Sequence, residues 1–141
     1  MLRFIHNTRS RNSRKIGELT ALEIRDARLS AIRITQQVAY HDEILDLQRG
    51  RPIPSSSSII SLNPKLDNGV LCIGSRLEHA SIALDSKYPI ILPSNARITA
   101  LLIADFHEKF AHSSTDRTLH EIRKLYWIPR GRQVIRKIVK R

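Results

Sequence analysis

The sequence is poor in cysteine. Its single cysteine, Cys72, excludes both an internal disulfide and a Cys-x-x-Cys metal site within these 141 residues. Because Cys72 lies in the apolar run from Val70 to Ile73, we interpret it as a buried and inert thiol. A chain without disulfides suits a reducing compartment, so we predict an intracellular protein of the nucleus or cytoplasm.

Long apolar runs and common catalytic motifs are also lacking. No stretch approaches the roughly 18 consecutive apolar residues that a membrane span requires, and the N-terminus has no apolar segment long enough for a secretory signal. We therefore predict no membrane partner. The sequence has no G-x-S-x-G motif, so its serine, histidine and aspartate residues do not indicate a hydrolase.

Acidic residues are scarce, and the basic residues are clustered. Aspartate and glutamate number 13 against 24 lysines and arginines, which gives a formal net charge of +11. This charge favours DNA or RNA as a partner. Residues 1–16 hold five Lys or Arg and no acid, so we predict a basic disordered arm there; residues 121–141 hold eight Lys or Arg and one acid.

Residues 17–58 are predicted to form a helical spacer followed by a serine-rich linker. The stretch after Thr20 has no glycine or proline and carries apolar residues at helical spacing, which predicts one long helix to about Leu47. Four consecutive serines, Ser55 to Ser58, then indicate a flexible joint. The domain boundary is placed here, so that a second domain covers residues 59–141.

The second domain is expected to begin with a short two-strand element and to continue with three helices. Val70 to Ile73 and Tyr88 to Pro93 are the predicted strands, both bounded by turn signals. The predicted helices run from a cap at Ser94-Asn95 to about Phe110, from about Thr115 to Leu125, and onward from Gly131. The expected fold class is therefore mainly α.

Two histidines, His107 and His112, have a spacing that suits zinc ligands. Residues five apart on a continuous helix point about 140° away from each other, so both imidazoles face one ion only if the helix stops between them. The run Ser113-Ser114-Thr115 reads as a turn with an N-cap, which agrees with such a stop. From spacing alone, two such histidines are more often one solvated and one packed residue than a pair of metal ligands.

The C-terminal helix is predicted to be basic and amphipathic. After Gly131 the apolar residues Val134, Ile135, Ile138 and Val139 alternate with lysine and arginine. Such a surface attracts phosphates with an affinity that falls as salt rises. The residues predicted to contact nucleic acid are Arg130, Arg132, Arg136, Lys137, Lys140 and Arg141.

Several short motifs occur in a fixed order between Ser61 and Arg141. They are Ser61-Leu62-Asn63-Pro64, Leu66-Asp67, Gly69-Val70-Leu71, Gly74-Ser75-Arg76-Leu77, Tyr88-Pro89-Ile90-Ile91-Leu92-Pro93, the run from His107 to His112, Leu125-Tyr126-Trp127-Ile128 and Gly131-Arg132. In this order they resemble the integrase region of Bel/Pao-type LTR retrotransposon polyproteins. The similarity is greatest to the N-terminal zinc-binding domain of those integrases, the His-His-Cys-Cys module.

The resemblance implies a three-helix domain in which His107, His112 and a downstream cysteine pair hold zinc. The cysteine pair is not in this sequence, and neither is the acidic catalytic core of an integrase, so we expect an incomplete domain at 59–141 and no enzymatic activity. The expected role is nucleic-acid contact and assembly in DNA integration, in a chain that can be a homo-oligomer. The alternative hypothesis is a domesticated or relic helical scaffold for protein interaction, without metal or DNA binding.

Overall fold

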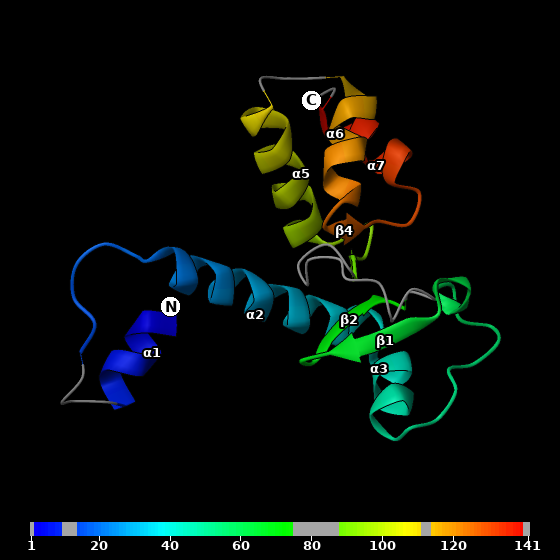
Figure 1. Ribbon diagram of the computed structural model, residues 1–141, viewed down its shortest axis with the longest axis horizontal. Helices are drawn as coiled ribbons and strands as arrows, with labels where there is room; N and C mark the ends of the chain where they lie inside the picture. Colours follow the sequence, from blue (N-terminus) through cyan, green and yellow to red (C-terminus); the bar gives the residue numbers. More distant parts are fainter. Residues whose placement is uncertain (1, 10–13, 75–87, 111–113, 140–141) are drawn as a thin grey trace, which may run out of the picture. The chain divides into compact units, whose positions relative to one another are not determined.

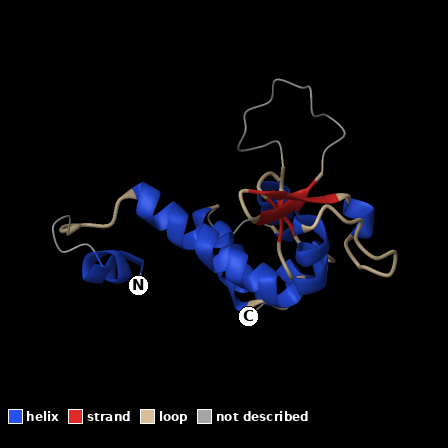
Figure 2. Ribbon diagram, turned by 90° about the horizontal axis from the view of Figure 1, so that it is seen from below, coloured by secondary structure: helices blue, strands red, loops and turns tan. Residues whose placement is uncertain are grey.

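The computed structural model describes residues 2–9, 14–74, 88–110 and 114–139. The chain is mainly helical and carries one small sheet, drawn in red in Figure 2. It divides into two compact units, Met1–Ala31 and Ile32–Arg141. The predicted site residues His112, Lys140 and Arg141 lie outside the described residues.

The first unit begins with a helix where a disordered arm is expected. Leu2–Arg9 form α1, and the guanidinium of Arg3 donates two hydrogen bonds to the carboxylate of Glu23, at 3.0 and 2.6 Å. These hydrogen bonds connect α1 to the first turn of the following helix, α2 (Ala21–Ala39). Glu23 also accepts a hydrogen bond from the backbone N–H of Thr20, whose hydroxyl accepts one from the N–H of Glu23, which makes a capping box.

The single long helix predicted after Thr20 is two helices in the structure. They are α2 (Ala21–Ala39) and α3 (His41–Gln48), separated at Tyr40, whose φ and ψ of −133° and 40° are not helical. The change of direction brings α3 against the first strand of the sheet. No glycine or proline marks this break in the sequence, so the apolar pattern alone predicted an uninterrupted helix.

The sheet has four strands in the order β1-β2-β3-β4, where two were expected. They are listed in chain order as β1 (Pro64–Asp67), β2 (Val70–Ile73), β3 (Ile90–Ile91) and β4 (Tyr126–Trp127). The first two form a hairpin whose central residues, Asn68 and Gly69, both have positive φ, as a type I′ turn requires. Strand β3 pairs with β2 antiparallel and with β4 parallel, so the chain returns to the sheet after two intervening helices.

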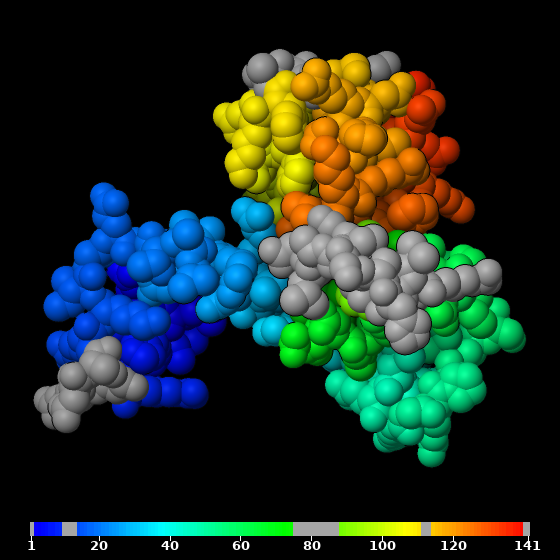
Figure 3. Space-filling model, in the orientation of Figure 1, coloured from blue at the N-terminus to red at the C-terminus, as the bar shows by residue number. Residues whose placement is uncertain are grey.

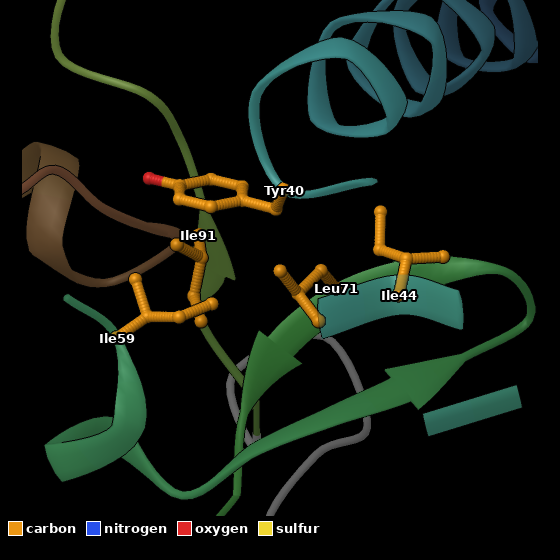
Figure 4. Close-up of a cluster of buried hydrophobic side chains, with 5 residues drawn as sticks. All are labelled: Tyr40, Ile44, Ile59, Leu71 and Ile91. Atoms are coloured by element: carbon orange, nitrogen blue, oxygen red, sulfur yellow. The ribbon is translucent and has the colours of Figure 1, made fainter. Parts of the chain in front are cut away.

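The core of the second unit forms where α3 and the end of α2 meet the sheet. Figure 4 shows the five side chains that converge there: Tyr40, Ile44, Ile59, Leu71 and Ile91. Each is at most 7% exposed. Burial of this kind contributes roughly 1.5–3 kcal/mol per large apolar side chain.

A fully buried glutamine of α2, Gln36, joins two strands of the sheet. Its Nε2 donates hydrogen bonds to the carbonyl oxygens of Leu71, at 2.9 Å, and Ile91, at 2.6 Å. Its Oε1 accepts one from the N–H of Leu71, at 2.8 Å. The side-chain amide carries the same donor and acceptor groups as a backbone peptide unit. It therefore forms hydrogen bonds to β2 and β3 of the kind that a neighbouring strand would form.

Candidate metal and nucleic-acid site

Three helices follow β3 and carry the predicted site residues. They are α5 (Arg97–Lys109), α6 (Thr115–Arg123) and α7 (Gly131–Val139). The three pack on one another, and Figure 1 shows them grouped beside β4. In the space-filling view α5 is yellow, α6 orange and α7 red, and their side chains form a closely packed surface (Figure 3).

Local sequence sets the ends of these helices. The cap predicted at Ser94-Asn95 is wrong: α5 begins after Ala96, which makes no side-chain cap, and the Thr99 hydroxyl instead donates to the carbonyl of Pro93, at 2.7 Å. The cap predicted before α6 is confirmed, since the Ser114 hydroxyl accepts a hydrogen bond from the N–H of Arg117, at 3.4 Å.

The helices approach closely because Gly131 has no side chain. A Cβ at this position would lie 3.1 Å from Cδ1 of Leu119, so α7 begins in direct contact with α6. Ile122 of α6 and Ile135 of α7 are both buried. Phe106 of α5 then packs edge-on against Tyr126 of β4, with ring centroids 6.2 Å apart, which joins the helices to the sheet.

His107 lies in the last turn of α5. Its imidazole is half-buried, and its Nδ1 atom is buried. The helix ends at Lys109 and is capped by Phe110, so the predicted stop between His107 and His112 is confirmed. A helix that ends between the two histidines is what a shared metal ion requires of the backbone. His112 itself lies outside the described residues.

The described residues do not make a complete zinc site by themselves. Across residues 2–9, 14–74, 88–110 and 114–139, no group of three or more His, Cys, Asp or Glu side chains is placed to hold a metal ion. A cysteine binds zinc only as the deprotonated thiolate. Cys72 is buried in β2, and burial raises the pKa of its thiol to about 12, so it does not suit this role.

The basic face of α7 is exposed along the helix. Arg132, Arg136 and Lys137 are exposed, whereas Ile135 is fully buried. At 100° per residue, the polar and basic positions occupy one half of the helix and the apolar positions occupy the other. Arg130 precedes the helix, is also exposed, and has a φ of 53°. Four of the six predicted contact residues are therefore described, and all four are exposed.

The acids near this face are already engaged by basic side chains. Asp116 of α6 lies 2.8 Å from a guanidinium nitrogen of Arg132, and both side chains are more than 60% exposed. The carboxylate of Glu121 accepts a hydrogen bond from Lys124, at 2.6 Å, which lowers its pKa. Exposed pairs of this kind contribute little to stability, so a phosphate can replace Asp116 as the partner of Arg132 at small cost.

Sequence reasoning missed one exposed basic residue with an aromatic partner. The guanidinium of Arg123, at the end of α6, lies over the indole of Trp127, 5.5 Å from the ring centroid. Arg123 and Trp127 are four residues apart, a spacing that brings side chains together on a continuous helix. Here α6 ends at Arg123 and Trp127 lies in β4, so helical spacing does not indicate the pair. Trp127 is half-buried.

Residues 95–141 match the family model described as the integrase zinc binding domain. The matched segment covers α5, α6, β4 and α7, and it supports an integrase N-terminal domain in this part of the chain. What matches is the zinc-binding domain and not a catalytic core. No curated protein and no solved structure matches the chain. Within the part that the structure describes, no helix has the length and apolar character needed to cross a bilayer.

Proposed function

We propose that this chain is an integrase-derived fragment, of the Bel/Pao retrotransposon type, that contacts DNA or RNA through α7 and acts in assembly for DNA integration. The observation that carries the proposal is that α7 has its basic and polar residues on one side and its apolar residues on the other. Its apolar half packs on α5 and α6, which leaves Arg132, Arg136 and Lys137 directed away from the core on a helix without any acid.

This surface suits phosphates rather than bases. Lysine and arginine on one exposed helix face neutralise backbone charges, and such contacts carry no sequence information. Each phosphate neutralised on duplex DNA adds about −0.9 to the slope of log affinity against log salt. Four basic residues, Arg130, Arg132, Arg136 and Lys137, would therefore give a slope of about −3.6 if each contacts one phosphate.

Reversing two charges on α7 tests the proposal. We expect Arg136→Glu with Lys137→Glu to weaken binding to unrelated duplexes by the same factor and to reduce the salt slope by about 2. The measurement is fluorescence anisotropy of a labelled duplex across a salt series. Arg49→Glu with Arg51→Glu is the matched control, because both residues are exposed and the net charge changes equally. Unchanged affinity of the α7 variant at low salt would refute the assignment.

We propose His107 and His112 as two zinc ligands. Bound zinc would supply a fixed link between the end of α5 and the segment before α6, and the family's site completes its tetrahedron with two cysteine thiolates. Two imidazoles are half of such a donor set. We therefore expect this chain to bind zinc weakly, since structural zinc sites draw their affinity from four ligands.

A second candidate function is a helical scaffold that binds protein. It is favoured by Ile34 and Val38 of α2, which are 69% and 83% exposed and lie four residues apart on one helix face. A scaffold would bind its protein partner, or a second copy, equally well or better at high salt. Nucleic-acid binding through α7 weakens under the same conditions, so one salt series separates the two.

A further inference from the structure

A hollow of about 670 Å³ lies beside Trp127 on the second unit. The residues that line it include Ser61, Asn63 and Gly74 as well as Trp127. We infer that this hollow holds an unpaired base of a single-stranded nucleic acid, with the base stacked on Trp127. The inference rests on the proposed nucleic-acid function and adds to it the form of nucleic acid that this chain selects.

The chemistry of the wall fits a neutral, flat heteroaromatic ring. Among the described residues that line the hollow none is charged, and these residues therefore offer no partner to an ionic group. The single aromatic residue offers a stacking surface, which every base can use whatever its sequence. Ser61 and Asn63 are exposed, and their hydroxyl and amide groups can pair with the polar edge of a base. The volume lies within the range of roughly 300–1,000 Å³ that small-molecule sites occupy.

The hollow is held open by backbone contacts on both sides. Asn63 ends the short helix η1 (Ile60–Leu62) with a φ of 45°, and its carbonyl accepts a hydrogen bond from the N–H of Gly74, at 2.9 Å. A Cβ at Gly74 would overlap this carbonyl oxygen, so glycine is required for the approach. On the other side, the carbonyl of Trp127 accepts a hydrogen bond from the N–H of Leu92, at 2.8 Å. The site is therefore preorganised.

The guanidinium of Arg123, next to the hollow, is the partner that we expect for the phosphates of the bound nucleic acid. Arg123 is exposed and its guanidinium lies over the indole ring, 5.5 Å from the centroid. A nucleotide whose base stacks on Trp127 brings its own phosphate within reach of that guanidinium. Paired bases in a duplex cannot enter without unstacking, so the hollow discriminates in favour of single strands.

Trp127 is the only tryptophan of the chain, so its fluorescence reports on this site alone. The experiment titrates the protein with a short oligothymidylate, with an abasic strand of equal length and with a duplex, following tryptophan emission and the anisotropy of a label. We expect all three to bind by anisotropy and only the oligothymidylate to quench Trp127. Binding without quenching, or equal quenching by the abasic strand, would overturn the inference but not the proposed function. Absence of binding by anisotropy would overturn both.

A pair of asparagine variants provides a second test that does not disturb Trp127. Asn63 and Asn68 both have positive φ, 45° and 47°, so glycine is tolerated at either position. Asn63→Gly removes the amide from the hollow, and we expect it to weaken single-strand binding by roughly 2–10-fold while duplex binding is unchanged. Asn68→Gly lies in the hairpin turn and should change neither. Equal single-strand affinity of the two variants would contradict the assigned role of Asn63.

Discussion

Replacing Gln36 with leucine should remove the hydrogen bonds that join β2 to β3. The substitution nearly conserves volume but leaves three buried backbone groups without their partner: the N–H and carbonyl of Leu71 and the carbonyl of Ile91. An unsatisfied buried group costs about 1–3 kcal/mol, and the added apolar surface returns about 1–2 kcal/mol. For the three groups together we expect the free energy of unfolding to fall by about 1–8 kcal/mol, a large part of the total for a domain of this size.

Urea denaturation followed by Trp127 emission measures this loss, because Trp127 lies in the same unit as Gln36. The matched control is Gln37→Leu, one position along the same helix. The side chain of Gln37 is exposed, and its amide lies 2.9 Å from Nδ1 of His41, so this change should cost less than about 0.5 kcal/mol. A loss below about 1 kcal/mol for Gln36→Leu would show that the amide does not hold the two strands together.

Two further predictions concern Cys72 and the histidines. The pKa of Cys72 is raised by burial to about 12, against an ordinary value of 9.0, so the folded state retains the thiol proton; the contribution of this thiol to stability should therefore be constant below pH 9 and fall as pH rises from 9 towards 12. At pH 8 a thiol reagent should label Cys72 slowly until urea unfolds the chain, and immediate labelling of the folded protein would contradict its burial. For zinc, competition with a chromophoric chelator should give weak binding that His107→Ala abolishes and His41→Ala, at an exposed histidine of α3, leaves intact. Retention of full affinity in His107→Ala would exclude His107 as a ligand.

The helices α6 and α7 could be predicted because their signals are local. Ser114 as a cap, Gly131 as a start and the apolar spacing of Leu119 and Ile122 all lie within one or two helical turns. The exposed basic face of α7 followed from the same spacing. These features depend on neighbours in sequence, so the sequence alone contains them.

The sheet and its connection to α2 could not be predicted in the same way. Strands β2 and β3 lie within the predicted strands Val70 to Ile73 and Tyr88 to Pro93, but β4 has only two residues, too few for any periodicity, and 34 residues, 92–125, separate it from its partner β3. Gln36 occupies an apolar position of α2, and nothing in its local sequence separates it from the exposed Gln37. Its role depends on Leu71 and Ile91, which are 35 and 55 residues away. The hollow beside Trp127 likewise joins segments that are distant in the chain.

The parallel pairing of β3 with β4 bears on where this protein can be cut without loss of its fold. The segment with an integrase match begins at residue 95, yet it contains β4 and excludes β3. A fragment cut at that boundary would lose the hydrogen bonds that Ile90 and Leu92 make to Leu125 and Trp127, and Tyr126 would lose its neighbouring strand. The border of the family match therefore differs from that of the fold, and an expression fragment should keep the whole second unit, Ile32–Arg141, since β3 also pairs with β2.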